Sequence, residues 1–109
     1  MTVNELAAGL SLRPIALPDG NREVEGVYIG DLLSWVMGRA QSGNAWITIM
    51  SNLNIVAVAT LADVSCIILA EGVTLDEQVI ETATSKDVNI LSTDKTAYEV
   101  AAILARMGT

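Results

Sequence analysis

The sequence predicts a single α/β domain, with a mainly parallel sheet of four to five strands and helices on both faces. Residues 45–50 and 65–70 are apolar runs without alternation, which is typical of parallel strands that are buried on both faces. The segment between them, residues 55–62, is apolar nearly all round, so this helix must be covered on more than one side. Strand–helix–strand order with short loops then indicates right-handed parallel crossovers.

One domain, residues 1–109, accounts for the whole chain, because no repeat or linker interrupts it. In chain order we expect a helix ending near residue 10, strands at 12–17 and 26–29, a helix at 32–40, a strand at 45–50, a helix at 53–62, a strand at 65–70, a helix at 74–86, a strand at 89–91 and a helix at 95–107. Pro14 confines the first strand to an edge or to a place outside the main sheet, since proline donates no ladder hydrogen bond.

Capping signals predict where the helices begin. The Thr-x-x-Glu sequences at residues 2–5 and 74–77 read as capping boxes, in which the hydroxyl and the carboxylate each accept from a free N–H group. Asp31 and Thr93 are expected to cap the helices that follow them, because short oxygen-bearing side chains are preferred at that position.

Charge and composition restrict the partners. The chain has 13 acidic and 6 basic residues, and the basic residues are scattered singly, which argues against nucleic acid and anionic membranes. No apolar run reaches the ~20 residues that span a bilayer. The first residues include an acid and no basic leader, so we expect no signal peptide. Cys66 is single and lies in an apolar strand, which predicts a buried, inert thiol and a cytoplasmic protein.

The residues needed for common catalytic chemistry are missing. The chain contains no histidine, which removes the usual general base and the usual zinc ligand. It contains no phosphate-cradling P-loop. The carboxylate pairs, Asp76 with Glu77 and Glu23 with Glu25, fit solvated structural roles at a helix start and a strand start. We therefore expect no catalytic residue, no metal and no cofactor.

A weak ligand site is expected where the parallel strands end. Ligands of open parallel sheets bind beyond the carboxyl ends of the strands, and helix N-termini there can hold an anion. Ordinary capping of the helices is the competing interpretation, because Glu71 and Asp94 add negative charge to the same loops. The candidate ligand-binding residues are Ser51, Asn52, Asn54, Gly72, Thr74 and Thr93.

The helix at 32–40 carries apolar side chains in too many directions for one sheet-facing stripe. Some of them must be covered by another segment or by another chain, and aromatic residues and Met are enriched at subunit interfaces. Plain core packing is the alternative. We expect a homodimer whose interface includes Leu32, Leu33, Trp35, Val36 and Met37.

Several segments, taken in order, resemble the DRTGG domain. They are Gly-Val-Tyr-Ile-Gly-Asp-Leu-Leu-Ser-Trp-Val-Met-Gly at 26–38, Ala-Trp-Ile-Thr at 45–48, Asp-Val-Ser-Cys-Ile-Ile-Leu-Ala-Glu-Gly at 63–72 and Ile-Leu-Ser-Thr at 90–93. The resemblance extends from Thr2 to Leu104 and is strongest to small stand-alone DRTGG proteins. Related domains occur between the CBS domains of some inorganic pyrophosphatases, in some phosphate acetyltransferases and at the N-terminus of HPr kinase/phosphorylase. It implies an α/β regulatory or assembly module, often dimeric, without catalytic residues.

The chain departs from the motif that names the family. The Asp-Arg-Thr of the family falls on Ser51, Asn52 and Leu53, so both charges are absent here. Of the Gly-Gly pair, the first position is Glu71 and the second is Gly72.

Three functions follow as hypotheses. The first is a non-enzymatic regulatory module that dimerises and acts through a partner protein. The second is a sensor that binds a nucleotide or another metabolite at the carboxyl edge of the sheet. The third, an enzyme such as a kinase, is disfavoured because the P-loop and histidine are missing.

Overall fold

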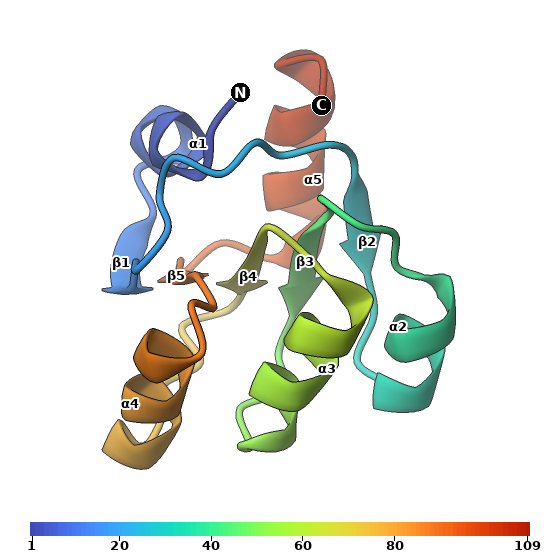
Figure 1. Cartoon of the computed structure of the whole chain (residues 1–109). Helices are drawn as coiled ribbons and strands as arrows, with labels where there is room; N and C mark the ends of the chain where they lie inside the picture. The colour runs from blue at the N-terminus through green and yellow to red at the C-terminus, as the bar shows by residue number, and fades with distance from the viewer.

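The computed structural model describes all 109 residues and shows one five-stranded sheet with helices on both faces (Figure 1). Its elements are α1 (Val3–Leu10), β1 (Arg13–Ala16), β2 (Val27–Ile29), α2 (Leu33–Arg39), β3 (Ala45–Thr48), α3 (Asn54–Ala62), β4 (Cys66–Leu69), α4 (Glu77–Ser85), β5 (Ile90–Ser92) and α5 (Ala97–Arg106). The predicted fold class and the order of the elements are therefore confirmed.

The sheet has the strand order β1-β5-β4-β3-β2. β2, β3, β4 and β5 run parallel to their neighbours, whereas β1 pairs antiparallel with β5 at the edge. The edge position of β1 was predicted from Pro14, and the pairing of β1 shifts register between Pro14 and Ala16. A proline can occupy such an edge because its missing N–H group costs no hydrogen bond inside the sheet.

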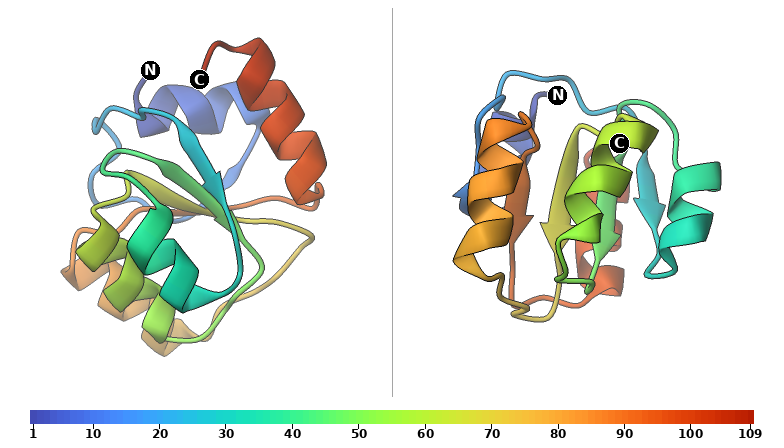
Figure 2. Two further views of the ribbon diagram at one scale, coloured as in Figure 1. Left: turned by 90° about the vertical axis from the view of Figure 1, so that its right-hand side faces the viewer. Right: turned by 60° about the horizontal axis from the view of Figure 1, so that its bottom comes forward.

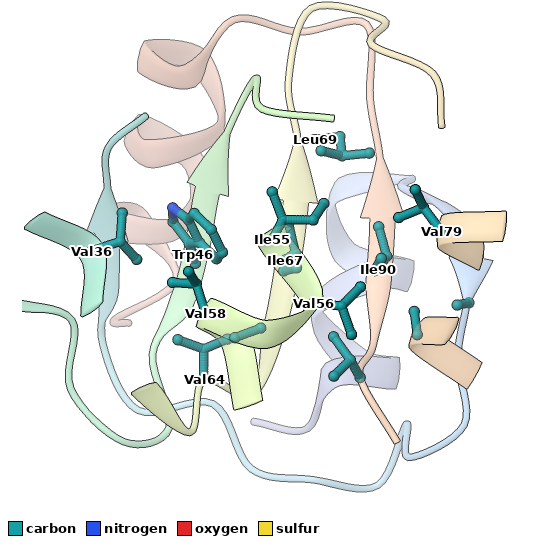
Figure 3. Packing of buried hydrophobic residues seen from close by; sticks show 14 residues of the cluster. Val36, Trp46, Ile55, Val56, Val58, Val64, Ile67, Leu69, Val79 and Ile90 are labelled. Atoms are coloured by element: carbon teal, nitrogen blue, oxygen red, sulfur yellow. The ribbon is translucent and has the colours of Figure 1, made fainter. Parts of the chain in front are cut away.

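Two cores sandwich the sheet, with α2, α3 and α4 covering one face and α1 and α5 the other (Figure 2). Along β3, Trp46 belongs to the first core, while Ala45 and Ile47 belong to the second. Every position of β3 is buried for this reason, which explains its apolar sequence without alternation. Figure 3 shows the first core, where Val36 of α2 and Val58 of α3 lie near Trp46.

The predicted cap at Asp31 is wrong. α2 begins at Leu33 with Leu32 as its N-cap, and no side chain caps it. The Asp31 carboxylate instead accepts hydrogen bonds from the Thr48 hydroxyl at 2.7 Å and from the Ile49 N–H at 3.0 Å. It thereby satisfies donors at the end of β3, which draws the β2–α2 loop against the neighbouring strand.

The caps predicted at residues 74–77 and at Thr93 are also wrong. α4 begins only at Glu77, after Asp76, and no side chain caps it. α5 begins at Ala97, and its capping box joins Thr96 to Glu99 rather than involving Thr93. The capping box at residues 2–5 is confirmed.

An ion pair ties the long β1–β2 connection to the end of α3. Arg22 Nη2 lies 2.8 Å from Asp63 Oδ1 and donates to the Asp63 carbonyl at 2.7 Å. The Ser42 hydroxyl donates to the other carboxylate oxygen. Hydrogen bonds from Ser42 and from Arg22 lower the pKa of Asp63 below its ordinary value of 3.8. The carboxylate therefore links three segments that are distant in sequence.

We expect Asp63→Asn to reduce the dependence of stability on acid pH. A carboxyl group whose pKa is lower in the folded state stabilises the fold above its unfolded pKa of roughly 3.9, and this stabilisation is lost as pH falls through the folded pKa. Asn tolerates the left-handed backbone of this position, where φ is 58°, so the substitution adds little strain. Denaturant unfolding at neutral and at acid pH measures the free energy of unfolding of both proteins. We expect the difference between wild type and variant to become smaller at acid pH. A difference in the free energy of unfolding that does not change with pH would contradict a stabilising role for the ionised Asp63 carboxylate.

No helix of the structure is both long enough and apolar enough to cross a bilayer.

Candidate functional site

The carboxyl edge of the sheet brings two of the three predicted ligand loops together. The Gly72 N–H donates to the Thr93 carbonyl at 2.9 Å, and the Glu71 N–H donates to the Lys95 carbonyl at 2.8 Å. Gly72 and Thr93 are thus neighbours at this edge. Thr74 lies on the same β4–α4 loop and is exposed.

The third loop remains separate. Ser51 and Asn52 are exposed at the start of α3, and no hydrogen bond joins them to the loops after β4 and β5. Asn52 Oδ1 accepts from the Asn54 N–H at 2.9 Å, which is a local turn contact. The structure therefore places these residues at the expected edge without assembling them into a single pocket.

Ordinary turn chemistry accounts for the paired loops. Thr93 is buried, and its hydroxyl accepts from the Lys95 N–H at 3.2 Å. Gly72 has a φ of 71°, and a Cβ at this position would lie 3.2 Å from Asp94 Oδ1. A left-handed backbone favours glycine, and the close carboxylate leaves little room for a side chain. Both residues thus have structural roles in the absence of any ligand.

The electrostatics of this edge are acidic. Glu71 and Asp94 are both exposed. Arg13 pairs with Asp94 at 3.0 Å, and this hydrogen bond with the nearby positive charge lowers the pKa of that carboxyl below its ordinary value. Arg13 is already committed to a carboxylate and is therefore a poor additional anion ligand. Lys95 remains the other basic side chain of these loops.

Two hollows mark the surface, and neither is centred on the predicted ligand residues. The larger, with a volume of about 510 Å³, runs between α3 and α4 and includes Leu53, Asn54, Leu61 and Lys86. Asn54 is the one predicted ligand residue that contributes to either hollow. The smaller hollow, about 170 Å³, lies beside the Arg22–Asp63 pair, near the amino ends of β4 and β5. No group of three or more His, Cys, Asp or Glu side chains is placed to hold a metal ion.

The helix α2 divides the predicted interface residues between core and surface. Val36 is fully buried within the protomer, and Leu33 is partly buried against the same core. Leu32, Trp35 and Met37 are 57%, 52% and 47% exposed. We call these three exposed side chains the α2 patch. The core interpretation therefore holds for Val36 and largely for Leu33, while the α2 patch is free to meet another chain.

Trp35 is held in place at the surface. The guanidinium carbon of Arg39 lies 3.7 Å from the centroid of the Trp35 ring. Residues four apart lie on the same face of a helix, and a cation over an indole ring is attractive. The contact presents the ring in a fixed orientation, which lowers the entropic cost of using it as an anchor.

Cys66 is fully buried in β4, and its burial raises the pKa of the thiol to about 12. The thiolate is the reactive form, so we expect native Cys66 to resist iodoacetamide at neutral pH. The same protein should be alkylated readily in guanidinium chloride, which serves as the control. Mass spectrometry measures the extent of alkylation over time. Rapid alkylation of the folded protein would contradict the burial of Cys66.

Comparison with known proteins agrees with this architecture. Residues 16–107 match the family model of the DRTGG domain, a region that begins in β1 and includes the rest of the sheet. No curated protein matches the chain in sequence.

The fold is also similar to a crystal structure of the CBS and DRTGG domains of the regulatory region of Clostridium perfringens pyrophosphatase, complexed with the activator diadenosine tetraphosphate. The TM-score is 0.73 at 16% sequence identity, with 94% of this chain covered. The chain spans 45% of the length of that structure, and at this identity the likeness concerns the fold. The family match over most of the sequence, with the expected sheet and helices, shows that the chain belongs to the DRTGG domain family.

Proposed function

We propose that this protein is a non-enzymatic regulatory module that forms a homodimer through the α2 patch and acts through a partner protein. The observation that carries the dimer is the exposure of Leu32, Trp35 and Met37 beside a fully buried Val36. Val36 and Leu33 anchor the helix to its own core, so the remaining apolar side chains must face outward. Aromatic side chains and Met are enriched at the centres of protein interfaces.

A symmetric dimer is the simplest way to cover this patch. Large apolar side chains that are exposed on a short segment are candidates for contact with another chain. A two-fold axis applies the same patch to both copies, so one self-complementary surface is enough. The orientation of Trp35 under Arg39 supports this use, because the ring needs little ordering before it binds.

The regulatory role is supported by the family and by the chemistry of the chain. The DRTGG domain of the clostridial pyrophosphatase belongs to a regulatory region. The one thiol of this chain is buried and protonated, and the carboxylates with lowered pKa values serve caps or ion pairs. A module of this kind acts by presenting a binding surface to a partner protein. A pull-down from the source cell would identify that partner.

A nucleotide or metabolite sensor is the second candidate. It is favoured by the diadenosine tetraphosphate bound in the clostridial structure. The acidic carboxyl edge opposes it, because Glu71 and Asp94 would repel a polyphosphate and Arg13 is already paired. The regulatory dimer is therefore the function that the geometry supports best.

Sedimentation equilibrium of the wild-type protein over a range of micromolar concentrations tests the proposal. We expect a dimer, and a monomer at all concentrations would refute it. Melting temperature with and without diadenosine tetraphosphate tests the sensor, since a ligand that binds only the native state raises that temperature. We expect no concentration-dependent shift; a saturable increase would favour the sensor.

A further inference from the structure

The outer side of α3 is apolar although it faces solvent. Each of the other four helices contains a charged residue, whereas α3 contains none. Leu53 and Leu61 are 41% and 71% exposed, and Ala57 between them is also exposed. We call these three residues the α3 stripe. It belongs neither to the core nor to the α2 patch, so nothing described so far accounts for its apolar character.

The α3 stripe lines one wall of the larger hollow. Leu53, Ala57 and Leu61 all contribute to this hollow, and their spacing of four residues places them on one side of the helix. The buried Val56 also lines it, and α4 forms the opposite wall beside α3 (Figure 1). The volume of about 510 Å³ lies within the range of about 300–1,000 Å³ that is usual for small-molecule sites.

The middle of this hollow offers no free hydrogen-bond donor. The Thr60 hydroxyl donates to the Val56 carbonyl at 3.0 Å, and the Thr82 hydroxyl donates to the Gln78 carbonyl at 2.8 Å. A hydroxyl has one hydrogen, so neither threonine can donate to an occupant as well. The side chains at the ends of the hollow therefore decide which polar groups an occupant can carry.

Lys86 supplies the charge at one end. It follows the last residue of α4, and α3 and α4 run in the same direction because β3, β4 and β5 are parallel. Lys86 therefore lies at the end of the hollow opposite Asn54, the first residue of α3. Its ammonium group forms none of the ion pairs of the protein.

The larger hollow contains no carboxylate, although the chain has 13 acidic and 6 basic residues. The acids of this region are Asp19, Asp63 and Asp87, which line the smaller hollow that Lys86 also borders. Arg22 already pairs with Asp63 there. The larger hollow thus combines apolar walls with one unpaired positive charge at one end.

We propose that the larger hollow binds a small molecule with an extended apolar chain and a single carboxylate, of the class of medium-chain fatty acids. The apolar chain lies along the α3 stripe, and the carboxylate accepts from the ammonium group of Lys86. This inference goes beyond the proposed dimer, because the hollow includes no residue of the α2 patch.

The charge of the hollow selects this class over others. A polyphosphate would bring several negative charges to one lysine, with carboxylates next to it in the smaller hollow. A neutral apolar molecule would gain the contacts with the walls and nothing from Lys86. One carboxylate on an apolar chain matches both the number of charges and the length of apolar wall.

Titration with octanoate, followed by amide chemical shifts in NMR spectra, tests the site. We expect saturable shifts at Ala57, Thr60, Thr82 and Lys86. Hexanoate should bind several-fold more weakly, because a fully buried methylene contributes about fourfold in affinity. Octanol, the matched neutral compound, should shift the amides of α3 but bind more weakly than octanoate. The absence of saturable shifts, or shifts centred on another part of the protein, would refute the proposal.

Two variants separate the apolar wall from the charge. Ala57→Phe fills the hollow from the exposed side of α3 and should weaken octanoate and octanol at least tenfold. Lys86→Gln should weaken octanoate about two- to fivefold, the range of an exposed ion pair, and leave octanol unchanged. Arg106→Gln is the control, because Arg106 is an exposed basic residue on α5, outside both hollows. Equal octanoate affinity in Lys86→Gln and wild type would refute the role of the charge.

Sedimentation of the same variants keeps this proposal separate from the dimer. Ala57→Phe should have the same oligomeric state as the wild type. If it is monomeric where the wild type is a dimer, and octanoate causes no shift, the α3 stripe contacts another chain and the ligand site is refuted. If the wild type is monomeric and octanoate binds, the dimer fails and the ligand site stands. Should Ala57→Phe not fold, Leu61→Gln, at the most exposed position of the stripe, replaces it and should weaken both compounds.

Discussion

Trp35→Glu is expected to yield a folded monomer. The side chain is 52% exposed in the protomer, so the substitution leaves no cavity in the core. The new carboxylate lies four residues before Arg39 on the same helix, an arrangement that supports helices by ~0.3 kcal/mol. In the dimer, two such carboxylates would be placed in the apolar interface, where an unpaired charge is strongly unfavourable. Sedimentation together with circular dichroism measures both properties.

Tyr98→Glu is the matched control for this variant. Tyr98 is another exposed aromatic, 81% accessible, but it lies on α5 on the opposite face of the sheet. We expect the Tyr98 variant to remain dimeric at concentrations where the Trp35 variant is monomeric. If the Trp35 variant unfolds, Trp35 contributes to the core. If it is folded and still dimeric, the interface lies elsewhere.

Trp46→Ala is expected to cause the largest loss of stability. Trp46 is fully buried in the core beneath α2 and α3, and its indole N–H donates to the Gly30 carbonyl at 2.9 Å. Truncation of a buried tryptophan typically costs about 3–5 kcal/mol, because apolar contacts are lost and a cavity remains. For a domain of this size each kcal/mol lowers the melting temperature by roughly 4–8 °C. Thermal and urea unfolding would both show the loss.

Trp46→Phe separates the hydrogen bond from the packing. Phenylalanine retains most of the apolar volume but leaves the Gly30 carbonyl without its donor, and a lost buried hydrogen bond typically costs about 1–3 kcal/mol. We therefore expect a smaller loss than in Trp46→Ala. A loss as large as that of the alanine variant would show that the tie between β3 and the β2–α2 loop matters more than the packing.

The sequence determined the sheet and its layers. β3 and β4 are apolar at every position because each face of the sheet meets a different core, and no single-sided strand has this pattern. Pro14 limited β1 to an edge or to a place outside the main sheet, because proline lacks an N–H group, and the structure has β1 at the edge. The capping box of the first helix was correctly predicted at residues 2–5, although the same pattern at residues 74–77 caps no helix.

The tertiary structure alone decided the role of side chains whose partners are distant in sequence. Asp31 resembles a helix cap locally, yet it binds Thr48 and the Ile49 N–H because β2 and β3 are neighbours. Thr93 likewise lies in a loop held by Gly72, so α5 begins only after Thr96. Sequence patterns indicate contacts between residues that are close along one helix or strand. The hydrogen bonds of Asp31 and Thr93 join different elements of the fold.

The candidate interface shows the same division. The excess of apolar residues in α2 was visible in the sequence, and the structure covers only the side of the helix that carries Val36 and Leu33. Which residues face outward depended on how α2 packs beside α3, which buries Val36 and leaves Trp35 exposed. Composition determines how much apolar surface a helix carries, whereas the rotation of the helix against its neighbours decides which part of that surface remains for a partner.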